Sequence, residues 1–138
     1  MAESKLDCCP ICGHPLHHPL ASYCKRCKRL IDRVDTRKKP DKGARVRALQ
    51  KAWDGEGFRC HYTGIRLIED NPKDPRYLTF DHLIPREEQE IVIVAGAIND
   101  MKSDLADDEF RAMVVQLANR FKGEEFDENV FDLKHWKR

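Results

Sequence analysis

Two adjacent polar residues, Asp81 and His82, carry the chemistry that this sequence indicates most clearly. Asn99 and Lys102 follow them at a spacing of three, which places both on one face of a helix. Carboxylate and amide oxygens suit a hard cation such as Mg²⁺ or Mn²⁺. A neutral imidazole can take a proton from water near neutral pH, and a divalent ion stabilises charge on a phosphorus centre. The set therefore favours hydrolysis of a phosphodiester.

The elements that must position these residues are two strands and a helix. Residues 77–80 are typical of a strand, residues 85–89 form a polar connection, and residues 90–94 indicate a second, buried strand. Residues 97–105 have helical composition. In such a ββα unit the end of the first strand lies against the start of the helix, so Asp81 and Asn99 would face one cation. Alternation along the strand turns His82 to the other side, toward a water.

Three segments of this region resemble the HNH, or His-Me finger, endonucleases. They are Phe-Arg-Cys-His-Tyr-Thr-Gly at 58–64, Thr-Phe-Asp-His-Leu-Ile-Pro at 79–85 and Asn-Asp-Met-Lys at 99–102. The resemblance covers residues 58–105 and implies an α+β fold with a ββα-metal core. It implies that His82 is the general base and that Asp81 and Asn99 bind one catalytic Mg²⁺ or Mn²⁺. It also implies that Lys102 is a supporting residue on the side of the substrate phosphate. Without this context, Asp81 and His82 would more simply be a hydrogen-bonded pair in a turn.

The chain departs from the family pattern at two places. Many relatives carry a second zinc site, but here Cys60 is followed by Thr63, and the later pair of positions is not cysteine. We expect no second zinc, and Cys60 to be a small buried residue. The middle Asn that orients the catalytic His is replaced by Glu90. Glu90 is our candidate for orienting His82, and such a pair would raise the pKa of the imidazole.

A cluster of cysteines near the N-terminus predicts a structural zinc site. The proposed ligands form two CxxC pairs: Cys9, Cys12, Cys24 and Cys27. Two such turns can wrap one tetrahedral Zn²⁺, and a shell of four sulfurs leaves no position for a substrate. The spacing resembles a zinc ribbon or treble-clef knuckle. Cys8 could replace Cys9, and one of the loop histidines, His14, His17 or His18, could replace a cysteine.

Positive charge is concentrated in the first half of the chain, although the net charge is only +1. Residues 24–51 hold twelve Lys or Arg and three Asp, which can recruit a polyanion or simply form a solvated face. A helix over 43–53 would bury Val46, Leu49 and Trp53 and turn its basic residues to other faces. The predicted DNA contacts, mostly to phosphate, are Arg37, Lys38, Lys39, Arg45, Arg47 and Arg86.

The C-terminal quarter predicts one long helix, from residue 107 to 122, followed by a tail. Six apolar residues repeat at helical spacing, and we expect them to belong to the core: Phe110, Met113, Val114, Leu117, Ala118 and Phe121. The tail from 124 to 138 is too apolar to stay free, so we expect it to pack back on the body.

These patterns divide the chain into a zinc knuckle (1–30), a basic helical segment (31–57), the ββα core (58–105), and a C-terminal helix with its tail (106–138). The longest apolar run, residues 91–98, is too short for a membrane span, so we expect a cytoplasmic protein. The function expected is metal-dependent cleavage of DNA, one nick per binding event by a monomer. The alternatives are a zinc-ribbon nucleic-acid-binding module with an inactive HNH unit, and a hydrolase of RNA or another phosphodiester. His61 and His135 are expected to be structural or exposed.

Overall fold

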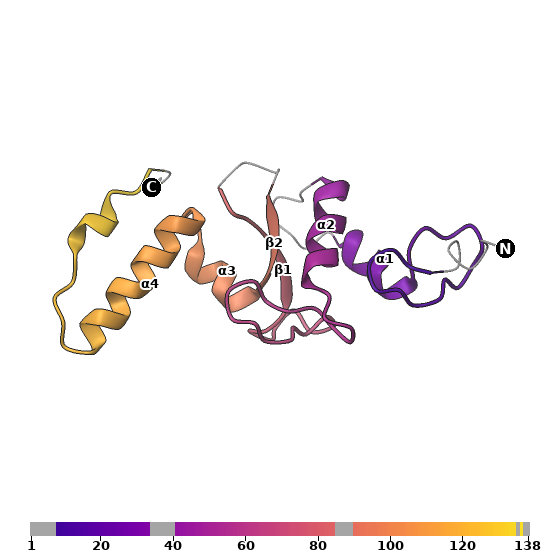
Figure 1. Ribbon diagram of the computed structural model, residues 1–138, viewed down its shortest axis with the longest axis horizontal. Coiled ribbons are helices and arrows are strands. Elements are labelled where there is room, and N and C mark those ends of the chain that lie inside the picture. Colours follow the sequence, from indigo (N-terminus) through magenta and orange to yellow (C-terminus); the bar gives the residue numbers. More distant parts are fainter. Residues whose placement is uncertain (1–7, 34–40, 85–89, 135, 137–138) are drawn as a thin grey trace.

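The computed structural model describes residues 8–33, 41–84, 90–134 and 136. The chain forms a mixed α+β structure around one antiparallel hairpin of two strands. On one side of the hairpin lie α1 (Lys25–Ile31), with the N-terminal loop, and α2 (Lys42–Ala52). On the other side lie α3 (Gly96–Lys102) and α4 (Asp107–Phe121) (Figure 1). The α+β class expected from the sequence is therefore confirmed.

The hairpin consists of β1 (Leu78–His82) and β2 (Ile91–Ala95), with Asp81 opposite Val92 and His82 opposite Ile91. Helix α3 (Gly96–Lys102) follows β2 without a connecting loop. Strand, strand and helix thus occur in the predicted order. β1 starts one residue later than predicted and extends two residues further, so Asp81 and His82 lie within the strand rather than after it.

Helix α2 (Lys42–Ala52) begins at Asp41, whose carboxylate accepts a hydrogen bond from the backbone N–H of Ala44. It packs against β2 through fully buried Leu49 and through Ala48. Arg45, predicted to contact DNA, is also on this buried face and is 7% exposed. Its guanidinium donates to the carbonyl of Ile31 in α1 (Lys25–Ile31). The prediction for Arg45 is wrong, because this side chain ties two helices together.

Helix α4 (Asp107–Phe121) is joined to the rest of the described body by Asp107, Phe110 and Arg111, all in its first turns. Phe110 is buried, at 6% exposed, but Leu117 is 40% and Phe121 is 83% exposed. The prediction that the whole apolar stripe belongs to the core is therefore wrong beyond Phe110. The reason is geometric: the helix runs past the end of the hairpin and leaves its second half away from the body (Figure 1).

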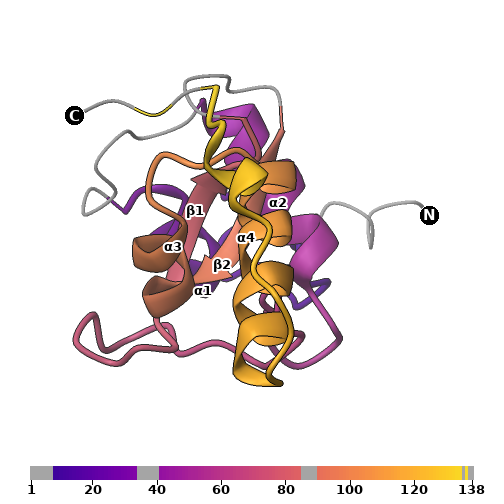
Figure 2. The ribbon, with the colours of Figure 1, turned by 90° about the vertical axis from the view of Figure 1, so that its left-hand side faces the viewer.

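The tail folds onto α4 rather than onto the central core, which corrects the second expectation for this region. A short 3₁₀ helix, η2 (Glu128–Phe131), runs back along α4 (Figure 2). The backbone N–H of Asp127 donates to the side chain of Gln116, at 2.9 Å, and that of Lys134 donates to Glu109, at 2.7 Å. Among the described residues, no helix has the length and apolar character needed to span a bilayer.

Candidate functional site

The four cysteines of the predicted zinc site are brought together. The Sγ atoms of Cys9, Cys12, Cys24 and Cys27 all lie within 4.8 Å of one another. Cys24 is the N-cap of α1 and Cys27 lies in its first turn, where its backbone N–H donates to the Cys24 sulfur at 3.4 Å. Four thiolates at this separation can hold one structural Zn²⁺ in a closed shell.

The turn that carries the first pair distinguishes Cys9 from Cys8. The backbone N–H of Gly13 donates to the carbonyl of Cys9, and Gly13 adopts a φ of 77°, which glycine tolerates best. This turn directs Cys9 inward, where it is 2% exposed, while Cys8 stays on the surface. His14 lies beside the cluster, with Nδ1 3.2 Å from the Cys12 sulfur. Cys9, not Cys8, therefore belongs to the cluster.

The thiols of the cluster cannot all ionise without a cation. Burial raises the pKa of Cys9, but hydrogen bonds from nearby backbone groups outweigh it and lower that pKa to about 7. Burial and the neighbouring thiols raise the pKa of Cys27. Ionisation of Cys9 is therefore favoured, whereas burial and then the neighbouring thiols oppose ionisation of Cys27. A divalent cation would offset that opposition.

Asp81 is the buried carboxylate of the second candidate site. It is 7% exposed, and burial raises the pKa of its carboxyl, against the attraction of Lys102. Its Oδ2 forms an ion pair with the ammonium of Lys102, at 3.1 Å. Apart from this ion pair, Oδ2 has no hydrogen-bond partner among the described residues. A metal ion bound by Asp81 would therefore share the carboxylate with the Lys102 ammonium.

Asn99 lies on the same side of the hairpin as Asp81. Its side-chain nitrogen donates to the Thr79 hydroxyl at 3.0 Å and to the Phe80 carbonyl at 3.4 Å. Thr79 is two residues before Asp81 in β1, so strand alternation puts both on the face that α3 covers. Because its nitrogen faces β1, the amide oxygen of Asn99 remains available as a ligand. The structure therefore brings these two predicted ligands to one face.

Lys102 has a different setting from the one predicted. Its side chain is 1% exposed, and its ammonium donates to the His82 carbonyl at 2.9 Å as well as approaching Asp81. Because this ammonium contacts the His82 carbonyl and the Asp81 carboxylate inside the protein, it cannot bind a phosphate at the surface. In this arrangement Lys102 is a positioning residue, which fixes the end of β1 against α3.

His82 is half-buried at the last position of β1, and strand alternation turns it away from Asp81. The next residue, Leu83, donates to the carbonyl of Glu90 at 3.0 Å and accepts from the backbone N–H of Asp107 at 2.8 Å. Glu90 is thus directly across the hairpin from the residue after His82, and its side chain is exposed. That Glu90 orients the imidazole stays a prediction.

Sequence reasoning missed a polar cluster beside this site. The Tyr62 hydroxyl donates to Asp107 at 2.7 Å, and Arg111 donates from Nε to both oxygens of the same carboxylate. Nη2 of Arg111 lies 3.3 Å from Nε2 of His61, for which the sequence predicts only a structural or exposed position. The sequence gives no signal for this cluster, because 45 residues separate Tyr62 from Asp107.

Of the other residues predicted to contact DNA, Arg47 is described and exposed on α2. Four lie outside the described residues: Arg37, Lys38, Lys39 and Arg86. Cys60, predicted to be small and buried, is 3% exposed and its sulfur accepts from the backbone N–H of Ala95. It therefore helps to join the loop after α2 to β2.

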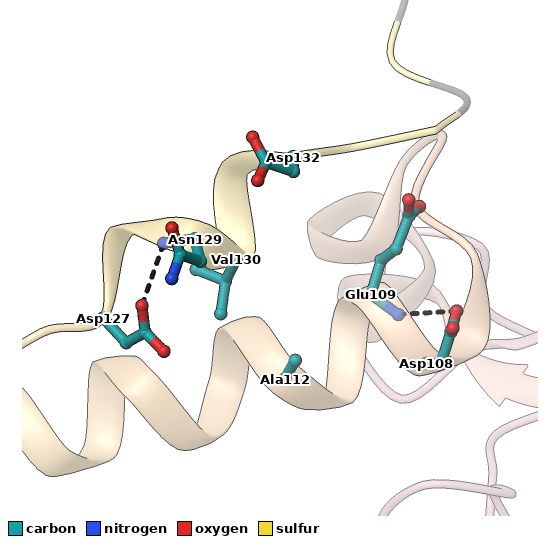
Figure 3. Close-up of a pocket in the computed structure, with 7 residues that line it drawn as sticks. All are labelled: Asp108, Glu109, Ala112, Asp127, Asn129, Val130 and Asp132. Carbon is teal, nitrogen blue, oxygen red and sulfur yellow. Dashed lines mark hydrogen bonds between the residues drawn. The ribbon is translucent and has the colours of Figure 1, made fainter.

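A shallow hollow between α4 and η2 is lined mainly by acidic residues, including Asp108, Glu109, Asp127 and Asp132 (Figure 3). The carboxylates of Asp108 and Asp127 accept hydrogen bonds from nearby backbone N–H groups. These contacts cap the local turns, so the hollow is explained by the packing of the tail. Its lining contains no residue of β1 or β2.

Comparisons with protein-family models, with curated proteins and with solved structures found no match to this chain.

Proposed function

We propose that this protein is a metal-dependent DNA endonuclease of the HNH type, with a ββα-metal core and a separate structural zinc knuckle. The observation that carries the proposal is the position of the buried Asp81 carboxylate on the hairpin face where Asn99 also lies. His82 is the adjacent residue of the same strand. A cation site and a general base thus come from neighbouring positions, as hydrolysis of a phosphodiester requires.

Each side chain has a distinct task in this mechanism. His82 takes the proton of the water that attacks phosphorus. Asp81 and Asn99 would hold one Mg²⁺ or Mn²⁺, which when bound stabilises the charge on the phosphate and on the departing oxygen. Lys102 keeps the end of β1 in place through the His82 carbonyl. Glu90 is the candidate for orienting the imidazole.

The basic residues bring the substrate to this site through its phosphates. Exposed Arg47 on α2 supports this role, together with the basic residues at 37–39 and at 86. The described residues hold one such set of side chains, so a monomer would cut one strand in each binding event. Nicked circular DNA is the expected first product.

The test is cleavage of a supercoiled plasmid with Mg²⁺ or Mn²⁺ by wild type, His82→Ala and Asp81→Asn. His17→Ala is the matched control, because His17 is exposed in the N-terminal loop. Wild type and His17→Ala should give nicked circles, whereas His82→Ala should lose at least about a hundredfold in rate. Intact plasmid with wild type at both ions, or equal cleavage by wild type and His82→Ala, would contradict the proposal.

The alternative function is a nucleic-acid-binding module whose HNH unit is inactive. The ammonium of Lys102, close to the proposed metal ligand, and the absence of the middle Asn favour it. It predicts salt-dependent DNA binding that His82→Ala leaves unchanged, with no hydrolysis. Competition between DNA and RNA in the same assay would separate a DNase from a hydrolase of RNA.

A further inference from the structure

We propose that Arg111 is a substrate-binding residue that holds a phosphate of the DNA strand beside the site of cleavage. The inference rests on the proposed function, because it assigns the substrate contact to the same site. It concerns the cluster of His61, Tyr62, Asp107 and Arg111, hereafter the Arg111 cluster.

The Arg111 cluster immobilises one guanidinium from three sides. Nε faces the two oxygens of Asp107 at 3.0 and 3.1 Å, and Nη2 faces His61. The plane lies over the Tyr62 ring, with 5.2 Å between Cζ and the ring centroid. Among the described residues, Nη1 makes no hydrogen bond, and the side chain is 55% exposed. A guanidinium that is held in place and has a free N–H edge can bind an anion.

The members of the Arg111 cluster are themselves anchored. Tyr62 packs its ring against buried Phe110, with 5.1 Å between the centroids, and gives its hydroxyl proton to Asp107. Burial lowers the pKa of His61, and the charge of Arg111 lowers it further. His61 is therefore neutral near pH 7, so its Nε2 can accept from Arg111. Asp107 and Arg111 alone, as an ion pair on α4, would lack the contacts with Tyr62 and His61.

The position of the cluster connects it to the proposed site. The backbone N–H of Asp107 donates to the carbonyl of Leu83, the residue that follows His82. Arg111 lies one helical turn after Asp107 and holds its carboxylate, so the cluster is attached to the residue that follows His82. Asp107 occupies the Nε side and leaves the Nη1 side open.

The experiment compares wild type, Arg111→Gln, Arg111→Lys and Arg120→Gln on a labelled DNA duplex. Arg120 is the matched control, since it is exposed near the other end of α4. Two quantities are measured: the salt dependence of binding without added divalent ion, and KM and kcat for cleavage with Mg²⁺ or Mn²⁺. Thermal unfolding of each variant establishes that the fold is kept.

Loss of one phosphate contact should reduce the slope of log K against log salt by about 0.9 in Arg111→Gln. KM should rise about tenfold with kcat nearly unchanged, because a hydrogen bond to a charged group is lost in both ground and transition states. Arg111→Lys should recover part of the slope, and Arg120→Gln should match wild type.

The two proposals fail in different ways. If wild type cleaves while Arg111→Gln keeps its slope and KM, the Arg111 assignment is wrong and the nuclease stands. If the slope changes as expected but no variant cleaves, the nuclease is wrong and the phosphate contact stands. An equal effect of Arg120→Gln, or a wild type that does not bind DNA, would overturn the assignment of Arg111.

Discussion

The ammonium of Lys102 lies 3.1 Å from the Asp81 carboxylate and donates to the carbonyl of His82, so one buried side chain contacts both residues of the Asp-His pair. Each of these groups would pay a high desolvation cost alone. The contact joins the last turn of α3 to the end of β1. It links the stability of the hairpin to the geometry of the proposed site.

Lys102→Met should therefore lower the free energy of unfolding by about 3 to 5 kcal/mol, because it leaves the Asp81 charge buried without a partner. The measurement is urea unfolding followed by circular dichroism. The double variant Asp81→Asn with Lys102→Met removes both charges and should be more stable than the single variant. A loss below about 1 kcal/mol for the single variant would show that the pair does not hold the hairpin.

The purified protein should contain one structural zinc ion. Cys27→Ser should lose the zinc and lower the melting temperature, because Cys27 supplies its ligand from the first turn of α1. Cys8→Ser is the control and should keep both, since Cys8 lies outside the cluster. Elemental analysis and thermal scans provide the measurements. Retention of zinc by Cys27→Ser, or its loss in Cys8→Ser, would show that the ligand set is different.

Arg45 and Arg47 should separate stability from DNA binding, although only one residue lies between them. Arg45→Ala removes the buried contact to Ile31 and should lower the free energy of unfolding by about 1 to 3 kcal/mol. Arg47→Ala should change stability by less than about 0.5 kcal/mol. It should also reduce the salt slope of DNA binding by about 0.9. Chemical unfolding and fluorescence anisotropy test these effects, and the opposite pattern would refute the assignment.

His61 should contribute a pH dependence of stability in the acid range. Burial, and then the charge of Arg111, lower the pKa of this imidazole below its ordinary value of 6.5. The unfolded chain therefore takes up the proton first as the pH falls. The stabilisation is fully present above about pH 6.5 and is lost as the pH drops from there through the folded-state pKa.

Comparison of wild type with His61→Gln isolates this contribution from the other histidines. The difference in their free energies of unfolding should change between pH 7 and pH 5, with wild type losing more. Arg111→Gln should weaken the effect without abolishing it, because burial is the larger cause. Parallel curves for wild type and His61→Gln across this range would exclude His61 as the source.

The sequence by itself determined the features that depend on local spacing. Two CxxC pairs bring four thiols into one cluster because each short turn fixes two ligands. The order of strand, strand and helix in residues 78–102 follows from apolar runs and from the helical composition after them. With that order, the positions of Asp81 and Asn99 on one face follow from strand alternation and from the packing of the helix.

Only the tertiary structure decided which of these side chains are buried and which distant ones meet. Arg45 is buried because a carbonyl of α1 accepts its hydrogen bond. The end of α4 is exposed because the helix extends away from the rest of the protein. Tyr62 meets Asp107 because the loop after α2 and the start of α4 converge on the end of the hairpin. Such contacts join segments far apart in the chain, so no periodicity records them. Burial also depends on what lies opposite a residue, which local sequence does not specify.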